Sequence, residues 1–197
     1  MSTLTDTACL AKVDWGCALV DLVCFSEGFA SDDELVRAEA ELDALRFRPA
    51  PAWLGPFDLL CFGEGYGRGR KLPAACRALA VRCIEAMPKQ LPSGHSIRYN
   101  ASFLQRYRPG FSVRPHVDPS TNIGYTSILS LGDFSHAPTL HVKGSTSLTP
   151  KRGDLVVLPC WRDGVPGPLH SVDGHPDQQG VRYTIIVNAV QLSSPTR

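Results

Sequence analysis

The pattern of apolar and polar positions changes character near residue 97 of this 197-residue chain. Before that point, apolar side chains recur at the three- and four-residue spacing of amphipathic helices. After it, short apolar runs alternate with turn residues, as in a protein built from short strands. The change predicts one domain over 1–197, with an N-terminal helical and lid region over about 1–96 and a β-barrel core over about 97–190.

Two helices are predicted in the first part. Ser31-Asp32-Asp33-Glu34 has the serine and glutamate spacing of a capping box and opens the first helix. Its apolar stripe contains Leu35, Ala38, Leu42 and Leu45. A second helix begins after Pro73, ends near Pro88 and carries Leu79, Cys83 and Ala86 on its apolar face.

The segments around these helices are expected to be a short strand over 20–25, a loop over 48–58 and a mobile segment over 62–70. Prolines at 49, 51 and 56 interrupt the loop, and the 62–70 segment is rich in glycine and aromatic residues. The second part predicts strands over 101–107, 112–117, 125–131, 139–143, 154–159 and 181–190. Short strands divided by glycine and proline are typical of a β-sandwich or barrel, and helices packed on its outer face would make an α+β domain.

Composition is that of an ordinary globular protein, with 43% hydrophobic and 20% charged residues. No apolar run approaches the roughly 20 residues of a membrane span, and the N-terminus has no secretory pattern. The seven cysteines are odd in number and include no C-x-x-C pair, which favours reduced thiols. We therefore expect an intracellular protein, in cytoplasm or nucleus, that has no membrane partner.

Charge is unevenly distributed, although the net charge is only +1. Residues 1–61 hold 4 basic and 11 acidic side chains, whereas residues 62–114 hold 10 basic and 2 acidic ones. Such a basic segment can follow a phosphate backbone, and it can equally consist of arginines on solvated helix faces.

The candidate chemistry lies in His116-Val117-Asp118, followed 52 residues after Asp118 by His170. On a strand, His116 and Asp118 point to the same side and can bind one ion together. Two imidazoles and one carboxylate on one face of a metal leave the opposite positions open, which is typical of non-haem Fe(II) oxygenases. Arg182 lies 12 residues after His170 and can bind a keto-acid carboxylate through two of its guanidinium nitrogens; Thr184 faces the same way.

The remaining histidines are expected to be structural or on the surface. His95, His136 and His175 lie beside turn residues, and His141 lies on a predicted strand. Cys160 has no basic or histidine neighbour arranged to activate it, so a thiol enzyme is not supported.

Several motifs, taken in order, resemble those of the AlkB-type dioxygenases of the 2-oxoglutarate- and Fe(II)-dependent superfamily. They are Gln105-Arg106-Tyr107-Arg108-Pro109-Gly110, His116-Val117-Asp118, Ser127 to Gly132, Arg152 to Val157, His170, and Arg182-Tyr183-Thr184. The resemblance implies a double-stranded β-helix, or jelly-roll, barrel. It also implies iron bound by His116, Asp118 and His170, with O₂ as co-substrate. Arg182 and Tyr107 would bind 2-oxoglutarate, and residues 53–71 would form a lid over the substrate.

This sequence departs from the AlkB-type pattern at three positions. Gln105 replaces the asparagine of the N-x-Y pair, Asn188 replaces a second arginine, and Ser120 replaces an acidic residue. Gln105, Thr184 and Asn188 are assigned to the cofactor site. Substrate contacts are assigned to Tyr66, Arg114, Trp161 and Ser120.

Three functions remain open. The first is hydroxylation or oxidative demethylation of a nucleic-acid base, with an extruded base stacked on aromatic side chains. The aromatic candidates, which could instead serve lid and core packing, are Trp53, Phe57, Phe62, Tyr66 and Trp161. The second is hydroxylation of a protein side chain such as proline or lysine. The third is an inactive barrel that acts as a binding module.

Overall fold

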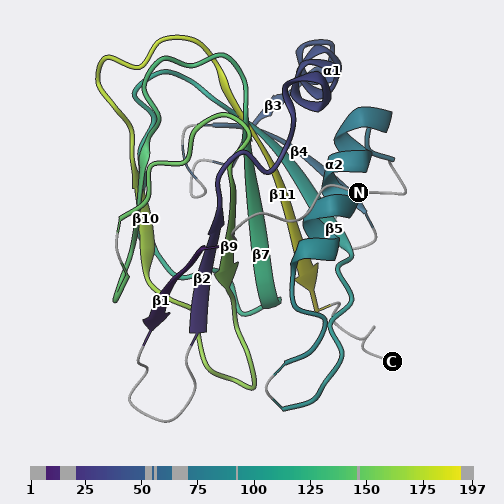
Figure 1. The fold of residues 1–197 in the computed structure, drawn as a ribbon, viewed down its shortest axis with the longest axis vertical. Coiled ribbons are helices and arrows are strands. Elements are labelled where there is room, and N and C mark those ends of the chain that lie inside the picture. The colour runs from purple at the N-terminus through teal and green to yellow at the C-terminus, as the bar shows by residue number, and fades with distance from the viewer. Residues whose placement is uncertain are drawn as a thin grey trace.

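Two antiparallel sheets and two helices make up the fold in the computed structural model, which describes residues 8–13, 21–51, 55, 57–63, 71–91, 93–145 and 147–191 (Figure 1). The first half contains β1 (Ala8–Val13), β2 (Asp21–Ser26), α1 (Asp32–Asp43), β3 (Arg48–Pro49), β4 (Asp58–Gly63) and α2 (Ala74–Ala86). The second half contains β5 (Ala101–Tyr107), β6 (Val113–His116), β7 (Asn122–Leu131), β8 (Thr139–Val142), β9 (Leu155–Pro159), β10 (His170–Asp173) and β11 (Arg182–Val190).

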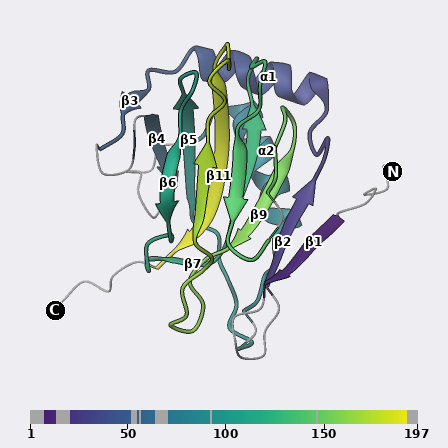
Figure 2. The ribbon, with the colours of Figure 1, turned by 90° about the vertical axis from the view of Figure 1, so that its left-hand side faces the viewer.

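The large sheet has the strand order β1-β2-β9-β7-β11-β5-β4-β3, and the small sheet has the order β6-β10-β8. Figure 2 shows the small sheet in front of the large one, with the helices behind. Apolar side chains from both sheets, with Leu148 from the segment after β8, fill the space between the sheets: Val23, Leu140, Val142, Val156 and Leu158, with Ile128 and Val172 packed against them. The fold is the predicted α+β jelly roll, because each sheet buries one face against the other.

The helices cover the outer face of the large sheet (Figure 1). Tyr183, Ile185 and Val187 of β11 belong to the same apolar cluster as the buried residues of both helices. Successive residues of a strand point to opposite faces, so Arg182 and Thr184 point the other way, into the space between the sheets. The helix packing therefore decides which side chains of β11 line the barrel interior.

Polar contacts fix α1 on this face. The backbone N–H of Gly132, just after β7, donates to Glu39 at 2.8 Å, and the Tyr183 hydroxyl donates to Asp43 at 2.7 Å. A Cβ at Gly132 would lie 2.2 Å from the carbonyl oxygen of Val181, so the close approach of the backbone before β11 requires glycine at this position. Neither helix is long and apolar enough to cross a membrane.

Both predicted helices are confirmed, and the predicted strands of the second half correspond to β5, β6, β7, β8, β9 and β11. The loop expected over 48–58 needs correction at its two ends, which belong to β3 and β4. Of the segment expected to be mobile over 62–70, Phe62 and Gly63 belong to β4, and residues 64–70 lie outside the described residues. Asp58–Gly63 is strand β4 and lies in the large sheet between β3 and β5. The lid expected over 53–71 stays a prediction, because residues 53, 54, 56 and 64–70 lie outside the described residues. The region expected to be helical thus also supplies β1 to β4.

Candidate metal centre

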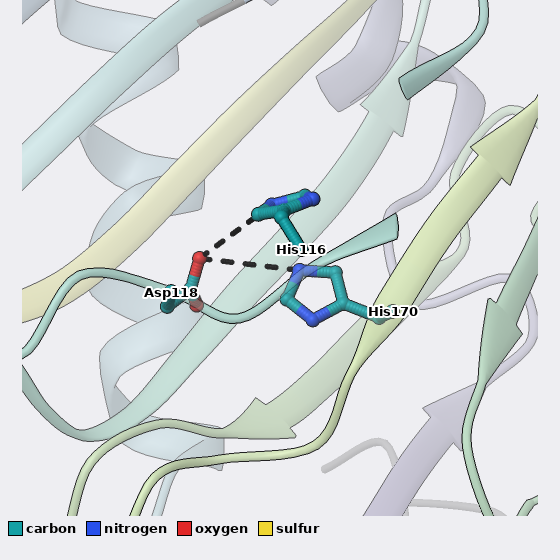
Figure 3. Close-up of side chains that lie close together, drawn as sticks. All are labelled: His116, Asp118 and His170. Carbon is teal, nitrogen blue, oxygen red and sulfur yellow. Dashed lines mark ion pairs between the residues drawn. The ribbon is translucent and has the colours of Figure 1, made fainter. Parts of the chain in front are cut away.

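Three side chains predicted as metal ligands converge between the two sheets. The possible ligand atoms of His116, Asp118 and His170 all lie within 4.8 Å of one another. Asp118 Oδ1 lies 3.9 Å from Nε2 of each histidine, so one carboxylate oxygen faces both imidazoles (Figure 3). The two imidazole rings are 4.3 Å apart between centroids. These spacings suit one ion held by two nitrogens and one oxygen.

Hydrogen bonds set which nitrogen of each imidazole can bind an ion. Nδ1 of His116 lies 2.9 Å from the carbonyl oxygen of Arg114, and Nδ1 of His170 lies 3.0 Å from that of Pro168. A carbonyl only accepts, so each Nδ1 carries the proton and each Nε2 presents a lone pair to the centre. Burial lowers the pKa of His170 and so favours its neutral, metal-binding form. The Asp118 carboxylate has the opposite, smaller effect on this pKa.

Strand pairing brings the two histidines together across 54 residues of sequence. His116 at the end of β6 is the direct partner of His170 at the start of β10, on neighbouring antiparallel strands. The register shifts between this pair and the pair of Val113 with Val172, so β6 contains a bulge. Pro115 lies in the bulge, where a residue without an N–H is tolerated.

Asp118 is fixed by two residues that follow β9. The buried thiol of Cys160 donates to Asp118 Oδ2 at 3.2 Å, and the Trp161 indole N–H donates to the Asp118 carbonyl at 2.6 Å. Burial, together with the neighbouring carboxylate, raises the pKa of the Cys160 thiol well above its usual value, so it remains a donor. Reasoning from sequence missed this role of Cys160, because nothing in the order of residues places it beside Asp118.

Arg182 is a buried cation in the space between the sheets. Its Nη2 donates to the Ser130 hydroxyl at 3.0 Å, and the guanidinium lies over the Tyr107 ring at 5.2 Å. In the part of the chain that the structure describes, Nε of Arg182 has no hydrogen-bond partner and no carboxylate forms an ion pair with it. Burial lowers the pKa of Arg182, so its environment disfavours the charge that it carries. A dicarboxylate such as 2-oxoglutarate would supply the missing anion.

The other predicted cofactor residues surround Arg182 or extend from it along β11. Tyr107 is the direct strand partner of Arg182, and Gln105 is the direct partner of Thr184. The hydroxyls of Tyr107 and Thr184 both donate to the Gln105 side-chain oxygen. Burial raises the pKa of Tyr107, which keeps its hydroxyl protonated. Asn188 is buried on the same face of β11, and its Oδ1 has no hydrogen-bond partner among the described residues.

The predicted substrate residues are placed less closely around the centre. Arg114 and Ser120 are exposed, and Arg114 contributes its carbonyl to His116. Trp161 is half-buried and lies against Asp118. Tyr66 lies outside the described residues, as does Trp53.

Two of the aromatic candidates for base stacking belong to the core. Phe57 packs in a cluster with Tyr107 and Phe111, and Phe62 packs against the helices. Part of the basic segment is also structural, since Arg82 pairs with Glu34 and Arg106 pairs with Asp58. The expectation that residues 62–114 bind a phosphate backbone therefore rests on the exposed basic side chains of this segment.

The other histidines lie away from the centre. His141 faces outward from the small sheet, with Nδ1 2.8 Å from the Ser147 hydroxyl and Nε2 3.1 Å from Asp173. His136 and His175 stack on each other, with ring centroids 4.4 Å apart. Among the described residues, the only group of three or more His, Cys, Asp or Glu side chains placed to hold a metal is the predicted one.

No protein-family model matches the chain, and no curated protein matches it. Solved structures do match. An oxidoreductase of the 2OG-Fe(II) oxygenase family from Burkholderia pseudomallei aligns with a TM-score of 0.59 at 14% identity, over 89% of this chain and 88% of its own. A Pseudomonas putida prolyl-4-hydroxylase aligns with a TM-score of 0.55 at 16% identity, over 86% and 92%. The structure of OsALKBH1 aligns with a TM-score of 0.52 at 12% identity, over 84% and 97%. At these identities the likeness shows a shared fold.

Proposed function

We propose that this chain is an Fe(II)- and 2-oxoglutarate-dependent dioxygenase. The observation that carries the proposal is the group of His116, Asp118 and His170, held between the same two sheets that bury Arg182, a cation that forms no ion pair with any described residue. A divalent metal and a keto acid with a second carboxylate together satisfy both features. The fold shared with the Burkholderia pseudomallei 2OG-Fe(II) oxygenase supports the proposal.

Iron and 2-oxoglutarate, when bound, supply oxidative decarboxylation of the keto acid coupled to insertion of one oxygen atom from O₂ into a substrate C–H bond. The protein's part is to bind the metal and to orient the keto acid and the substrate. His116, Asp118 and His170 would occupy one face of the metal, which leaves the opposite face for the keto acid, O₂ and the approaching substrate. Arg182, with Tyr107 beside it, would bind the distal carboxylate and fix the direction of the keto acid. The apolar layer between the sheets would keep bulk water from the reacting groups.

For the substrate we propose a nucleic-acid base, which would be hydroxylated or oxidatively demethylated. Support comes from the exposed Arg114 beside His116, from the half-buried Trp161 at Asp118 and from the fold shared with OsALKBH1. The exposed basic side chains that remain in the described part of residues 62–114 are Lys71, Arg77, Lys89, Arg98, Arg108 and Arg114.

A protein side chain is the second candidate substrate. The specific observation in its favour is the fold shared with a Pseudomonas putida prolyl-4-hydroxylase over most of both chains. The burial of Phe57 and Phe62, which removes two surfaces for base stacking, points the same way.

Succinate formation from 2-oxoglutarate, with Fe(II) and O₂, tests the proposal. We would measure it alone, with single-stranded oligonucleotides that carry N-methylated or C5-methylated bases, and with proline-rich and lysine-rich peptides. Stimulation by one class identifies the substrate class, and salt-sensitive stimulation marks the oligonucleotide. Asp118→Ala should abolish turnover, whereas His141→Ala on the outer face of the small sheet should leave it intact. If wild-type protein binds metal without any turnover, it is an inactive barrel and the dioxygenase proposal fails.

A further inference from the structure

The carboxylate of Asp118 is used asymmetrically. Oδ1 faces the Nε2 atoms of both histidines, whereas Oδ2 accepts the hydrogen bond from the Cys160 thiol. A free aspartate side chain rotates about its last torsion and can offer a metal either one oxygen or two. The Cys160 hydrogen bond opposes that rotation, because rotation would leave the buried S–H without its acceptor.

The backbone around Cys160 is itself held rigidly. The N–H of Cys160 donates to the Gly124 carbonyl at 2.8 Å, and the N–H of Gly124 donates to the Trp161 carbonyl at 2.8 Å. Cys160 is 1% exposed, and Gly167 lies against its backbone so closely that a Cβ at position 167 would be 2.5 Å from the Pro159 oxygen. The Cys160 thiol therefore has a fixed position from which it donates to Asp118.

Trp161 binds Asp118 through the main chain of the aspartate. Its indole N–H donates to the Asp118 carbonyl, so side chain and backbone of Asp118 are each bound to one of two consecutive residues. Two points of attachment fix both the position of the aspartate and the direction in which its carboxylate points.

We propose that Cys160 and Trp161 are positioning residues that make Asp118 a one-oxygen ligand and thereby keep a metal coordination position open. The inference rests on the proposed function, since it concerns the same metal centre. Without the thiol, Oδ2 would turn toward the metal and occupy a position that the keto acid or O₂ requires.

The test is Co(II) binding to purified, full-length, metal-free protein, followed by visible absorption, which depends on coordination number and geometry. Cys160→Ala should change the Co(II) spectrum and weaken Co(II) binding about 10-fold or more, as losses of such supporting contacts do. Cys160→Ser keeps a hydrogen-bond donor at this position and should therefore keep the wild-type spectrum and Co(II) affinity. Trp161→Phe, which loses the indole N–H but keeps an aromatic ring, should also weaken Co(II) binding.

Cys83→Ala is the matched control, because Cys83 is an equally buried thiol on α2, in the apolar cluster between the helices and the large sheet. It should leave the spectrum and the dissociation constant of Co(II) unchanged, whatever it does to stability. If folded Cys160→Ala had the wild-type spectrum and Co(II) affinity, this inference would be overturned, but the proposed function would not. The same would follow if Cys160→Ser lost as much Co(II) affinity as Cys160→Ala. Failure of the wild-type protein to bind one Co(II) per chain would instead overturn the proposed function.

Discussion

At the scale of single residues, the buried charge of Arg182 is the feature that most directly indicates an anionic ligand. Among the described residues no anion pairs with this buried cation, which is unfavourable, and replacing such a group by an apolar side chain of similar volume is often neutral or stabilising. Arg182→Met should therefore leave the protein without 2-oxoglutarate as stable as wild type or more so, and should remove the stabilisation by 2-oxoglutarate. In wild type that stabilisation should reach about 2.7 kcal/mol at a ligand concentration of 100 Kd. Thermal unfolding with Co(II) bound, with and without 2-oxoglutarate, measures both effects.

Arg106→Met is the matched control for this residue. Arg106 lies on the neighbouring strand but pairs at 2.6 Å with the buried Asp58, on the helix side of the sheet. Its loss leaves that carboxylate unpaired and should cost about 1–3 kcal/mol of stability, while the 2-oxoglutarate effect persists. A full 2-oxoglutarate effect in Arg182→Met would refute the role given to Arg182.

Site residues differ in how far sequence alone could find them. His116 and Asp118 were predictable because two ligands at i and i+2 are a local pattern on one strand. His170 was proposed from its spacing after Asp118, whereas its direct pairing with His116 arises from the register of β6 and β10, which the sequence does not show. Cys160 and Ser130 were not predictable, because their contacts with Asp118 and Arg182 depend on how distant strands pack.

At the scale of elements, α1 and α2 are joined by a charge whose effect depends on pH. Glu34 accepts from the Ser31 backbone N–H in the capping box and pairs with Arg82 of α2 at 2.5 Å. The hydrogen bond from Arg82 is the main cause that lowers the pKa of Glu34 to about 2 from an ordinary 4.5. The folded-state pKa is depressed, so its stabilisation is complete above the ordinary pKa and is lost as pH falls from 4.5 toward 2. Glu34→Gln keeps the capping geometry and should cost about 1 kcal/mol at neutral pH, because the pair is partly exposed.

Urea unfolding of wild type and Glu34→Gln at pH 7 and pH 3 measures this difference. The gap between the two proteins should shrink at the lower pH. A gap that is equal at both values would show that the carboxylate charge of Glu34 does not join the helices.

Elements were predictable where the hydrophobic pattern extends over enough residues. β11 is a long, nearly continuous buried run, and α1 has both a capping box and an apolar stripe. β4 has a regular alternation of buried and half-buried residues, but prolines before it and glycines after it concealed the strand. β10 has four residues, too few for a period of two to stand out, and it is a strand because it pairs with both β6 and β8.

At the scale of the whole molecule, the candidate metal centre joins the two sheets. His116 and His170 belong to the small sheet, whereas Asp118 is attached through Cys160 and Trp161 to the end of β9 in the large sheet. An ion bound by all three ligands should therefore stabilise the fold as a whole, because an unfolded chain does not present them together. Co(II) at 100 Kd should add about 2.7 kcal/mol and raise the Tm by about 5–10 °C relative to protein in chelator. Calorimetry of His116→Ala should show no such rise, and His141→Ala, which removes an outward-facing imidazole of the same sheet, should show the full one. An equal rise in His116→Ala would mean that the ion binds elsewhere, and the two sheets would then be held together by their apolar layer alone.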